Sequence, residues 1–282
     1  MSASLVMNLT GILLAGGESR RLNFNKIELR IDKIPLFIDQ IFKLSFFCNE
    51  ILISASEDNY EFISNELARI EDYHTLYYDF SSIMQIPPVR IIRDKKGEDG
   101  PFESIGPIRG IERGLEYAKN IYCLVIASDM PFISHNLLCM LKEISCSQVN
   151  SKDAFIIKTE KGFETLCGIY SKKCLNIIRN NIEKKVYKIS KIFNDLDTGV
   201  IFLNKLNIKN NNNLNFYKSN NLKVDGLNFF NINTLVDYNY FVKIWDFKIF
   251  LYQKFSKQLS RGAIDKSVYL FREKWKYFFY RQ

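Results

Sequence analysis

Residues 9–26 read "LTGILLAGGESRRLNFNK", in which an apolar run is followed by two adjacent glycines and then by three cations. The run at 9–15 predicts a buried strand. Gly16 and Gly17 favour a turn whose backbone N–H groups face a ligand, because glycine has no side chain to keep a ligand away. The cations are Arg20, Arg21 and Lys26. A polyphosphate suits such donors and charges, although an ordinary glycine turn with solvated cations has the same composition. The stretch matches neither the P-loop nor the dinucleotide fingerprint.

The order of apolar segments along the chain predicts the fold. Strands are predicted at 9–15, 50–56, 89–94 and 122–130, and helices at 35–47, 59–71, 106–119 and 134–145. Alternating strands and helices are typical of a mostly parallel sheet covered by helices on both faces. We therefore expect an α/β protein, a three-layer α/β/α sandwich with a Rossmann-like sheet. Residues 1–243 are expected to form this domain, and residues 244–282 a basic, aromatic-rich helical extension.

Composition excludes several classes of function. The formal net charge of the 282 residues is +8, and the ten Lys/Arg against three Asp/Glu in residues 241–282 contribute 10 − 3 = +7 of it. The rest of the chain is nearly neutral, which argues against nucleic acid as a partner. Six cysteines without a C-x-x-C pair and two distant histidines argue against a zinc site. No apolar run reaches the roughly 20 residues of a membrane span. We expect a cytoplasmic protein with no membrane partner.

Two further segments carry polar residues at the expected ends of strands. "LVIASDMPF" (124–132) is an apolar run that ends at Asp129. Ligands of open α/β sheets bind beyond the carboxyl ends of strands, where a carboxylate can hold Mg²⁺ against phosphate oxygens or simply cap a turn. In "GEDGPFESIGPIRGIERGL" (97–115), Gly106 and Pro107 open a helix, and Gly110 permits another backbone or a base to lie close. The alternative is an ordinary loop followed by helix packing.

Together, "LLAGGESRRLNFNK", "IIRD", "GPIRGI" and "IASDMPF" resemble nucleotidyltransferases that transfer a nucleoside monophosphate to a phosphorylated acceptor. The resemblance is greatest to the molybdenum cofactor guanylyltransferases of the MobA-like NTP transferase family, whose first segment reads LAGG-x-S-x-R-M-G-x-D-K. "FETLCGIYS" (163–171) and "FFNINTLVD" (229–237) are similar to later segments of that family. The resemblance covers about residues 9–240 and implies the nucleotide-diphospho-sugar-transferase-like fold. The LAGG form favours guanine, because cytidylyl relatives carry LAAG.

The resemblance implies a reaction and a role for each matching residue. GMP would move from GTP onto molybdopterin, giving molybdopterin guanine dinucleotide and pyrophosphate, with Mg²⁺ as cofactor. Arg21, Lys26 and Asp129 would be the catalytic residues, with Asp129 as the metal ligand. Asn231 and Asn233 would face the pterin acceptor. The nucleotide-binding residues would be Leu14, Ala15, Gly16, Gly17, Lys26, Ser54, Asp94 and Asp129.

Three positions depart from the family pattern. Asn23 replaces a glycine, Asn25 replaces the aspartate before Lys26, and Leu235 replaces a proline. A cytidylyl- or sugar-1-phosphate nucleotidyltransferase, or a non-catalytic nucleotide-binding homologue, remains an alternative. The basic tail has two interpretations as well: it covers the main domain or a second copy, or it docks on an acidic partner such as a molybdoenzyme or a pterin-delivery protein.

Overall fold

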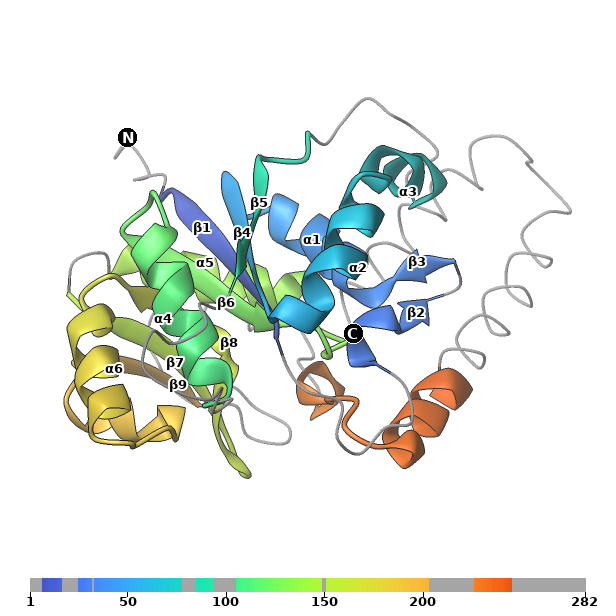
Figure 1. Ribbon diagram of the computed structural model, residues 1–282. Helices are drawn as coiled ribbons and strands as arrows, with labels where there is room; N and C mark the ends of the chain where they lie inside the picture. Colours follow the sequence, from blue (N-terminus) through green and yellow to red (C-terminus); the bar gives the residue numbers. More distant parts are fainter. Residues whose placement is uncertain are drawn as a thin grey trace, which may run out of the picture.

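A central sheet of seven strands organises the computed structural model, which describes residues 7–16, 25–31, 33–77, 85–93, 105–148, 151–202 and 226–244. The strand order is β5-β4-β1-β6-β8-β7-β9 (Figure 1). The strands are β1 (Leu9–Ala15), β4 (Glu50–Ala55), β5 (Val89–Arg93), β6 (Tyr122–Ala127), β7 (Ala154–Thr159), β8 (Gly162–Ser171) and β9 (Thr198–Phe202). A separate antiparallel ribbon consists of β2 (Arg30–Ile31) and β3 (Ile34–Pro35).

Four neighbouring strands of this sheet, β5, β4, β1 and β6, are parallel. β8 is antiparallel to β6 and β7, and β9 runs parallel to β7. Every residue of β1, β4 and β6 is buried, as expected for parallel strands covered on both faces. The predicted strand at 9–15 is confirmed, and β1 begins and ends at the predicted residues. Because β1, β4 and β6 point the same way, their last residues, Ala15, Ala55 and Ala127, lie along one edge of the sheet, here called the carboxyl edge.

Helices cover both faces of the sheet, which confirms the three-layer sandwich (Figure 1). One face packs against α1 (Leu36–Ser45), α2 (Glu57–Leu67), α3 (Ile70–Tyr77) and α5 (His135–Ser147). The other packs against α4 (Pro107–Tyr117), α6 (Cys174–Glu183) and the 3₁₀ helix η2 (Ile189–Asn194). The single helix predicted at 59–71 is wrong: the chain turns at residues 68–69 between α2 and α3. This turn brings the hydroxyl of buried Tyr73 to the carboxylate of Glu66, to which it donates a hydrogen bond.

A segment that follows the sheet in sequence returns to the carboxyl edge. It comprises the 3₁₀ helix η4 (Gly226–Phe229) and a helix at 235–244. Its Ile232 and Phe241 pack with Leu29, which precedes the ribbon, with Ile31 of the ribbon and with Leu36 of α1. Of the predicted extension at 244–282, everything beyond residue 244 lies outside the described residues.

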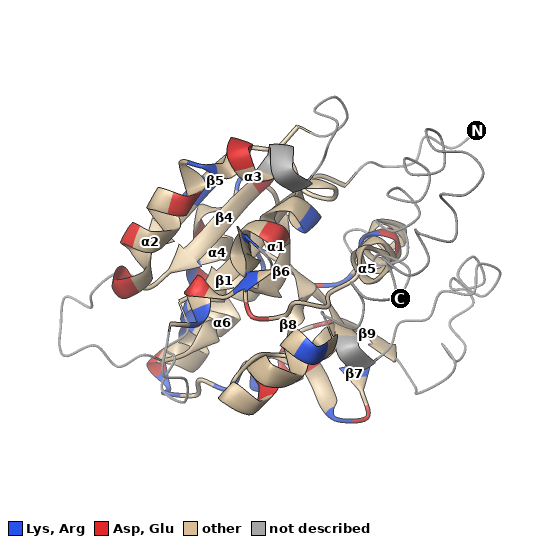
Figure 2. Cartoon of the chain, turned by 90° about the vertical axis from the view of Figure 1, so that its right-hand side faces the viewer, with Lys and Arg blue, Asp and Glu red and all other residues tan. Residues whose placement is uncertain are grey.

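Charges of both signs are interspersed over the described part of the chain (Figure 2). Several arginines there are paired: Arg30 with Glu66 at 2.7 Å, and Arg179 with Glu112 and Glu116 at 3.1 and 2.7 Å. Within the same ranges, no helix combines the length and the apolar character that a membrane crossing needs.

Candidate functional site

Three of the predicted site residues meet at the carboxyl edge. Lys26 is the first residue of the 3₁₀ helix η1 (Lys26–Glu28), and Asp129 lies two residues beyond the end of β6. The Lys26 ammonium lies 3.2 Å from Asp129 Oδ2 and donates a 2.6 Å hydrogen bond to Asn233 Oδ1. The side chains of Lys26 and Asp129 are only 16% and 20% exposed. A predicted phosphate-binding cation, a predicted metal ligand and a predicted acceptor residue are thus in direct contact.

The environment of Asp129 leaves its negative charge incompletely compensated. Burial raises the pKa of Asp129 above its ordinary value, and the charge of Lys26 only partly opposes this. Perturbed carboxylates of this kind concentrate at functional sites. Among the described residues, no group of three or more His, Cys, Asp or Glu side chains could enclose a metal ion. Mg²⁺ does not need such a cage, because it is often held by one or two carboxylates, water and substrate phosphates.

The backbone around Asp129 is fixed from two sides. Ile232 N donates a 3.0 Å hydrogen bond to the carbonyl oxygen of Asp129. From α1, Gln40 Nε2 donates to the carbonyl of Met130 at 3.1 Å, and Lys43 Nζ donates to that of Pro131 at 3.0 Å. Gln40 and Lys43 are buried, and Lys43 pairs with buried Asp39 at 2.8 Å. The turn that follows Asp129 therefore rests on a buried polar cluster behind the site.

A capping box holds Asn233 in place at the start of the helix 235–244. Asp237 Oδ2 accepts hydrogen bonds from the backbone N–H groups of Asn233 and Thr234, at 3.0 and 2.8 Å, and Thr234 Oγ1 accepts from Asp237 N at 3.2 Å. Burial alone would raise the pKa of Asp237, but hydrogen bonds from the Thr234 hydroxyl and from the backbone N–H groups of Asn233 and Thr234 to its carboxylate lower the pKa overall. Asn231 stands close by in sequence. Its Oδ1 is buried and accepts no hydrogen bond from the described residues.

The end of β1 lies beside helix α4. Leu14 is the register partner of Ser54 on β4, and its carbonyl oxygen accepts a hydrogen bond from Ser128 N at 3.0 Å. Gly110 of α4 packs on both: a Cβ there would lie 2.8 Å from Leu14 Cδ2 and 2.9 Å from Ser54 Oγ. The close approach predicted for Gly110, to another backbone or a base, is wrong for the described residues: the groups nearest to it are these two side chains. Leu14 and Ser54 are buried, whereas Gly16 is partly exposed at the edge.

The remaining predicted residues lie outside the described ranges. These are Gly17, Arg21 and Asp94, and also Asn23 among the departures from the family pattern. Their roles stay predictions.

Two asparagines that sequence reasoning did not place in the site connect its parts. Asn25 is the N-cap of η1, where its Oδ1 accepts a 3.3 Å hydrogen bond from Ile27 N. Asn25 Nδ2 donates to Asn59 Oδ1 at 2.6 Å, and Asn59 Nδ2 donates to the carbonyl of Ala15 at 2.7 Å. A signal existed for Asn59: it shares the spacing of Ile63 and Glu66 on the buried face of α2, and a polar side chain there requires a specific partner.

Comparison with known proteins points to one family. The family described as "MobA-like NTP transferase domain" matches residues 11–198, more than half of the chain. A Clostridium perfringens protein (strain SM101) named "Probable molybdenum cofactor guanylyltransferase" is 29% identical over 231 residues, 80% of this chain and 92% of the relative. A Desulfosudis oleivorans "Molybdenum cofactor guanylyltransferase" is 23% identical over 188 residues, 67% of this chain and 78% of the relative.

A solved structure shows the same fold. The "Molybdopterin-guanine dinucleotide biosynthesis protein A" of Archaeoglobus fulgidus aligns with a TM-score of 0.53 at 22% identity, covering 81% of this chain and 94% of that one.

Proposed function

Because the chain belongs to the family of MobA-like NTP transferase domains, we propose that it transfers GMP from GTP to the terminal phosphate of molybdopterin. The observation that carries this proposal is the contact of Lys26 with both Asp129 and Asn233. It joins the nucleotide side and the acceptor side of the predicted site at one point. The names of the similar proteins support guanine and molybdopterin as the substrates.

The reaction has a simple balance of bonds. An oxygen of the acceptor phosphate attacks the α-phosphorus of GTP, the new P–O bond forms, and the bond to the departing pyrophosphate breaks. No covalent enzyme intermediate is needed, because the acceptor is already anionic. The main difficulty is the repulsion between two polyanions, so catalysis rests on positioning and on charge stabilisation.

Different residues of this chain would supply the positioning and the charge stabilisation. Lys26 would exchange Asp129 for a phosphate oxygen of the bound nucleotide, and Arg21 would neutralise the outgoing phosphates with it. Asp129 and the carboxamide oxygen of Asn233 fit a hard cation. Mg²⁺ bound there would stabilise negative charge on the phosphate oxygens. The buried Oδ1 of Asn231 suits an N–H donor of the pterin.

The discriminating experiment measures pyrophosphate release from each of the four NTPs, with and without molybdopterin, at fixed Mg²⁺. We expect release with GTP that depends on the acceptor. Asp129→Asn should lower turnover by about 100-fold or more, whereas Asp58→Asn, on the exposed start of α2, should leave it unchanged. Undiminished turnover of Asp129→Asn would contradict the metal role.

Two alternatives give different results in the same assay. A cytidylyl- or sugar-1-phosphate nucleotidyltransferase would prefer another NTP or another acceptor. A non-catalytic homologue would bind GTP and release no pyrophosphate.

We also propose that residues 1–243 act as the transferase domain in the cytoplasm. The basic segment 244–282 is proposed to dock on an acidic molybdoenzyme or pterin-delivery protein. Deleting 244–282 should leave GTP binding intact and impair delivery of the product, and loss of folding would contradict docking.

A further inference from the structure

We propose that Asn59 is a positioning residue for nucleotide binding, because its carboxamide fastens the end of β1 to the turn that carries Lys26. This inference rests on the proposed function. Asn59 is 4% exposed. Its Nδ2 donates to the carbonyl of Ala15 at 2.7 Å, and its Oδ1 accepts from Asn25 Nδ2 at 2.6 Å. Ala15 ends β1 and Asn25 precedes Lys26, so one side chain connects the two ends of the glycine-containing stretch.

The orientation of both carboxamides follows from their backbone partners. The carbonyl of Ala15 can only accept a hydrogen bond, so the nitrogen of Asn59 must face it and the oxygen must face Asn25. Ile27 N can only donate, so the oxygen of Asn25 must face it and the nitrogen must face Asn59. The four groups form one chain of hydrogen bonds in which each donor meets an acceptor.

This chain demands an amide at position 25. An aspartate there would bring a carboxylate oxygen against Asn59 Oδ1, and two acceptors cannot share a hydrogen bond. Turning the Asn59 carboxamide would restore that contact but would remove the donor from the Ala15 carbonyl. Asn25→Asp changes almost no volume, so the packing is kept, but it adds a negative charge beside Lys26. In an Asn59→Leu background the hydrogen bond is already absent, so any further loss that Asn25→Asp causes there measures the effect of this charge.

The link from Asn59 to nucleotide binding runs through the position of Lys26. Asn25 caps the short helix whose first residue is Lys26, and the Lys26 ammonium is held by Asp129 and Asn233. Releasing Asn25 from Asn59 would free the turn while leaving Lys26 itself unchanged. If Lys26 is displaced, its charge-assisted hydrogen bond to a phosphate oxygen is lost, which weakens binding by about 10- to 100-fold.

The test measures GTP affinity of the full-length protein by calorimetry with Mg²⁺, alongside the thermal midpoint of unfolding. Asn25→Asp and Asn59→Leu should each weaken GTP binding by about 10- to 100-fold. Asn65→Leu, an exposed position on the same helix, is the matched control and should leave the affinity unchanged. In a Lys26→Ala background, Asn59→Leu should have little further effect on affinity, because Asn59 acts through Lys26.

The outcomes separate this inference from the proposed function. A wild-type protein that binds no nucleotide contradicts the proposed function. A wild-type protein that binds GTP, with Asn25→Asp binding it equally well, overturns the role of Asn59 alone. Lower thermal midpoints with unchanged affinities would give Asn59 a purely structural role and overturn the inference too. Asn25→Asp keeps the test decisive if Asn59→Leu fails to fold, since Asn25 is only partly buried.

Discussion

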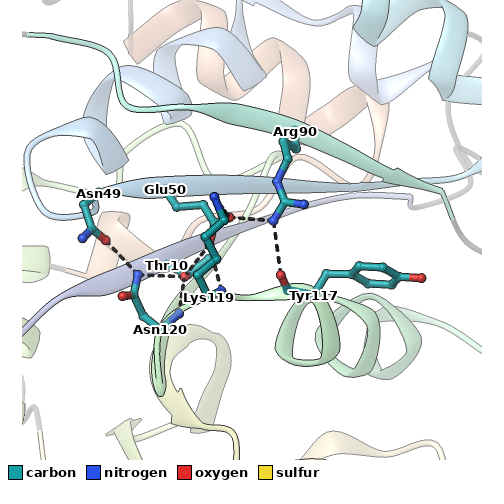
Figure 3. A network of polar contacts seen from close by, with 7 residues as sticks. All are labelled: Thr10, Asn49, Glu50, Arg90, Tyr117, Lys119 and Asn120. Atoms are coloured by element: carbon teal, nitrogen blue, oxygen red, sulfur yellow. Dashed lines mark hydrogen bonds and ion pairs between the residues drawn. The ribbon is translucent and has the colours of Figure 1, made fainter.

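A carboxylate lies at each end of the parallel strands: buried Glu50 at the amino ends and half-buried Asp129 at the carboxyl edge. The two differ in how many donors the protein directs at them. At the amino ends, Glu50 accepts hydrogen bonds from Thr10 Oγ1 at 3.0 Å, Lys119 N at 3.0 Å and Arg90 Nη2 at 2.6 Å (Figure 3). At the carboxyl edge, Asp129 has Lys26 beside it at 3.2 Å, and Lys26 is shared with Asn233.

The pKa shifts follow this difference. Burial would raise the pKa of Glu50, but the hydrogen bonds from Lys119, Arg90 and Thr10 outweigh it and lower the pKa. At Asp129 burial prevails over Lys26, and the pKa is raised. A carboxylate whose oxygens accept several hydrogen bonds from the protein stabilises the fold. A carboxylate whose oxygens accept fewer can still bind a ligand. The protein's own donors therefore satisfy the carboxylate at the amino ends of the strands, and they satisfy the one at the carboxyl edge less completely.

We expect the largest effect when each carboxylate is replaced by alanine and the free energies of unfolding of the two variants are compared. Glu50→Ala leaves the hydroxyl of buried Thr10 and the backbone N–H of Lys119 without their acceptor, so we expect a loss of about 2–4 kcal/mol. Asp129→Ala leaves Lys26 its bond to Asn233, so the loss should stay below about 1 kcal/mol. Denaturant unfolding of both variants measures the difference. Equal losses in the two variants would contradict the claim that Glu50 stabilises the fold more than Asp129 does.

A second test uses the dependence of stability on pH. Because the folded pKa of Glu50 lies below its ordinary value of 4.5, Glu50 contributes stability above pH 4.5 that is lost as the pH falls through the folded pKa. The folded pKa of Asp129 lies above its ordinary value of 3.8, so ionised Asp129 costs stability, and stability falls as the pH rises from 3.8 through the folded pKa.

The two conservative variants should therefore act with opposite sign. Relative to the wild type, Glu50→Gln should lose stability at neutral pH, and Asp129→Asn should gain it when no nucleotide is bound. For either carboxylate the slope cannot exceed about 1.4 kcal/mol per pH unit. Unfolding curves recorded between about pH 3 and 7 would reveal the signs, and a shift of the same sign for both variants would refute this account.

The buried parallel strands were predicted from the sequence more accurately than the arrangement of the candidate site residues. Parallel strands are buried on both faces, so their apolar runs predict them directly, and β1 has the bounds predicted for it. The split between α2 and α3 was not predicted, because Tyr73 donates to Glu66 through a tertiary contact that helical periodicity does not encode.

The site residues show the same limit. Lys26 and Asp129 could be predicted because both lie in segments that resemble the family's motifs, and the structure brings them together across 103 positions of sequence. Asn25 looked like a departure from the family pattern. It has a partner, Asn59, that lies 34 positions away, and only the folded chain reveals that the pair is matched.

We expect the smallest effect from a change at the start of the helix 235–244, at the carboxyl edge. Thr234→Ala removes the hydroxyl that accepts from Asp237 N and donates to Asp237 Oδ2. Loss of this N-cap should destabilise the helix 235–244 by about 1 kcal/mol, and Thr234→Ser should retain most of it. Hydrogen exchange should accelerate in residues 235–244 and not around Glu50, because the hydrogen bonds of Thr234 and Asp237 are local to the start of that helix, and Glu50 is bonded to Thr10, Arg90 and Lys119. If exchange near Glu50 accelerated as well, the two edges of the sheet would be coupled, and the contrast drawn between Glu50 and Asp129 would fail.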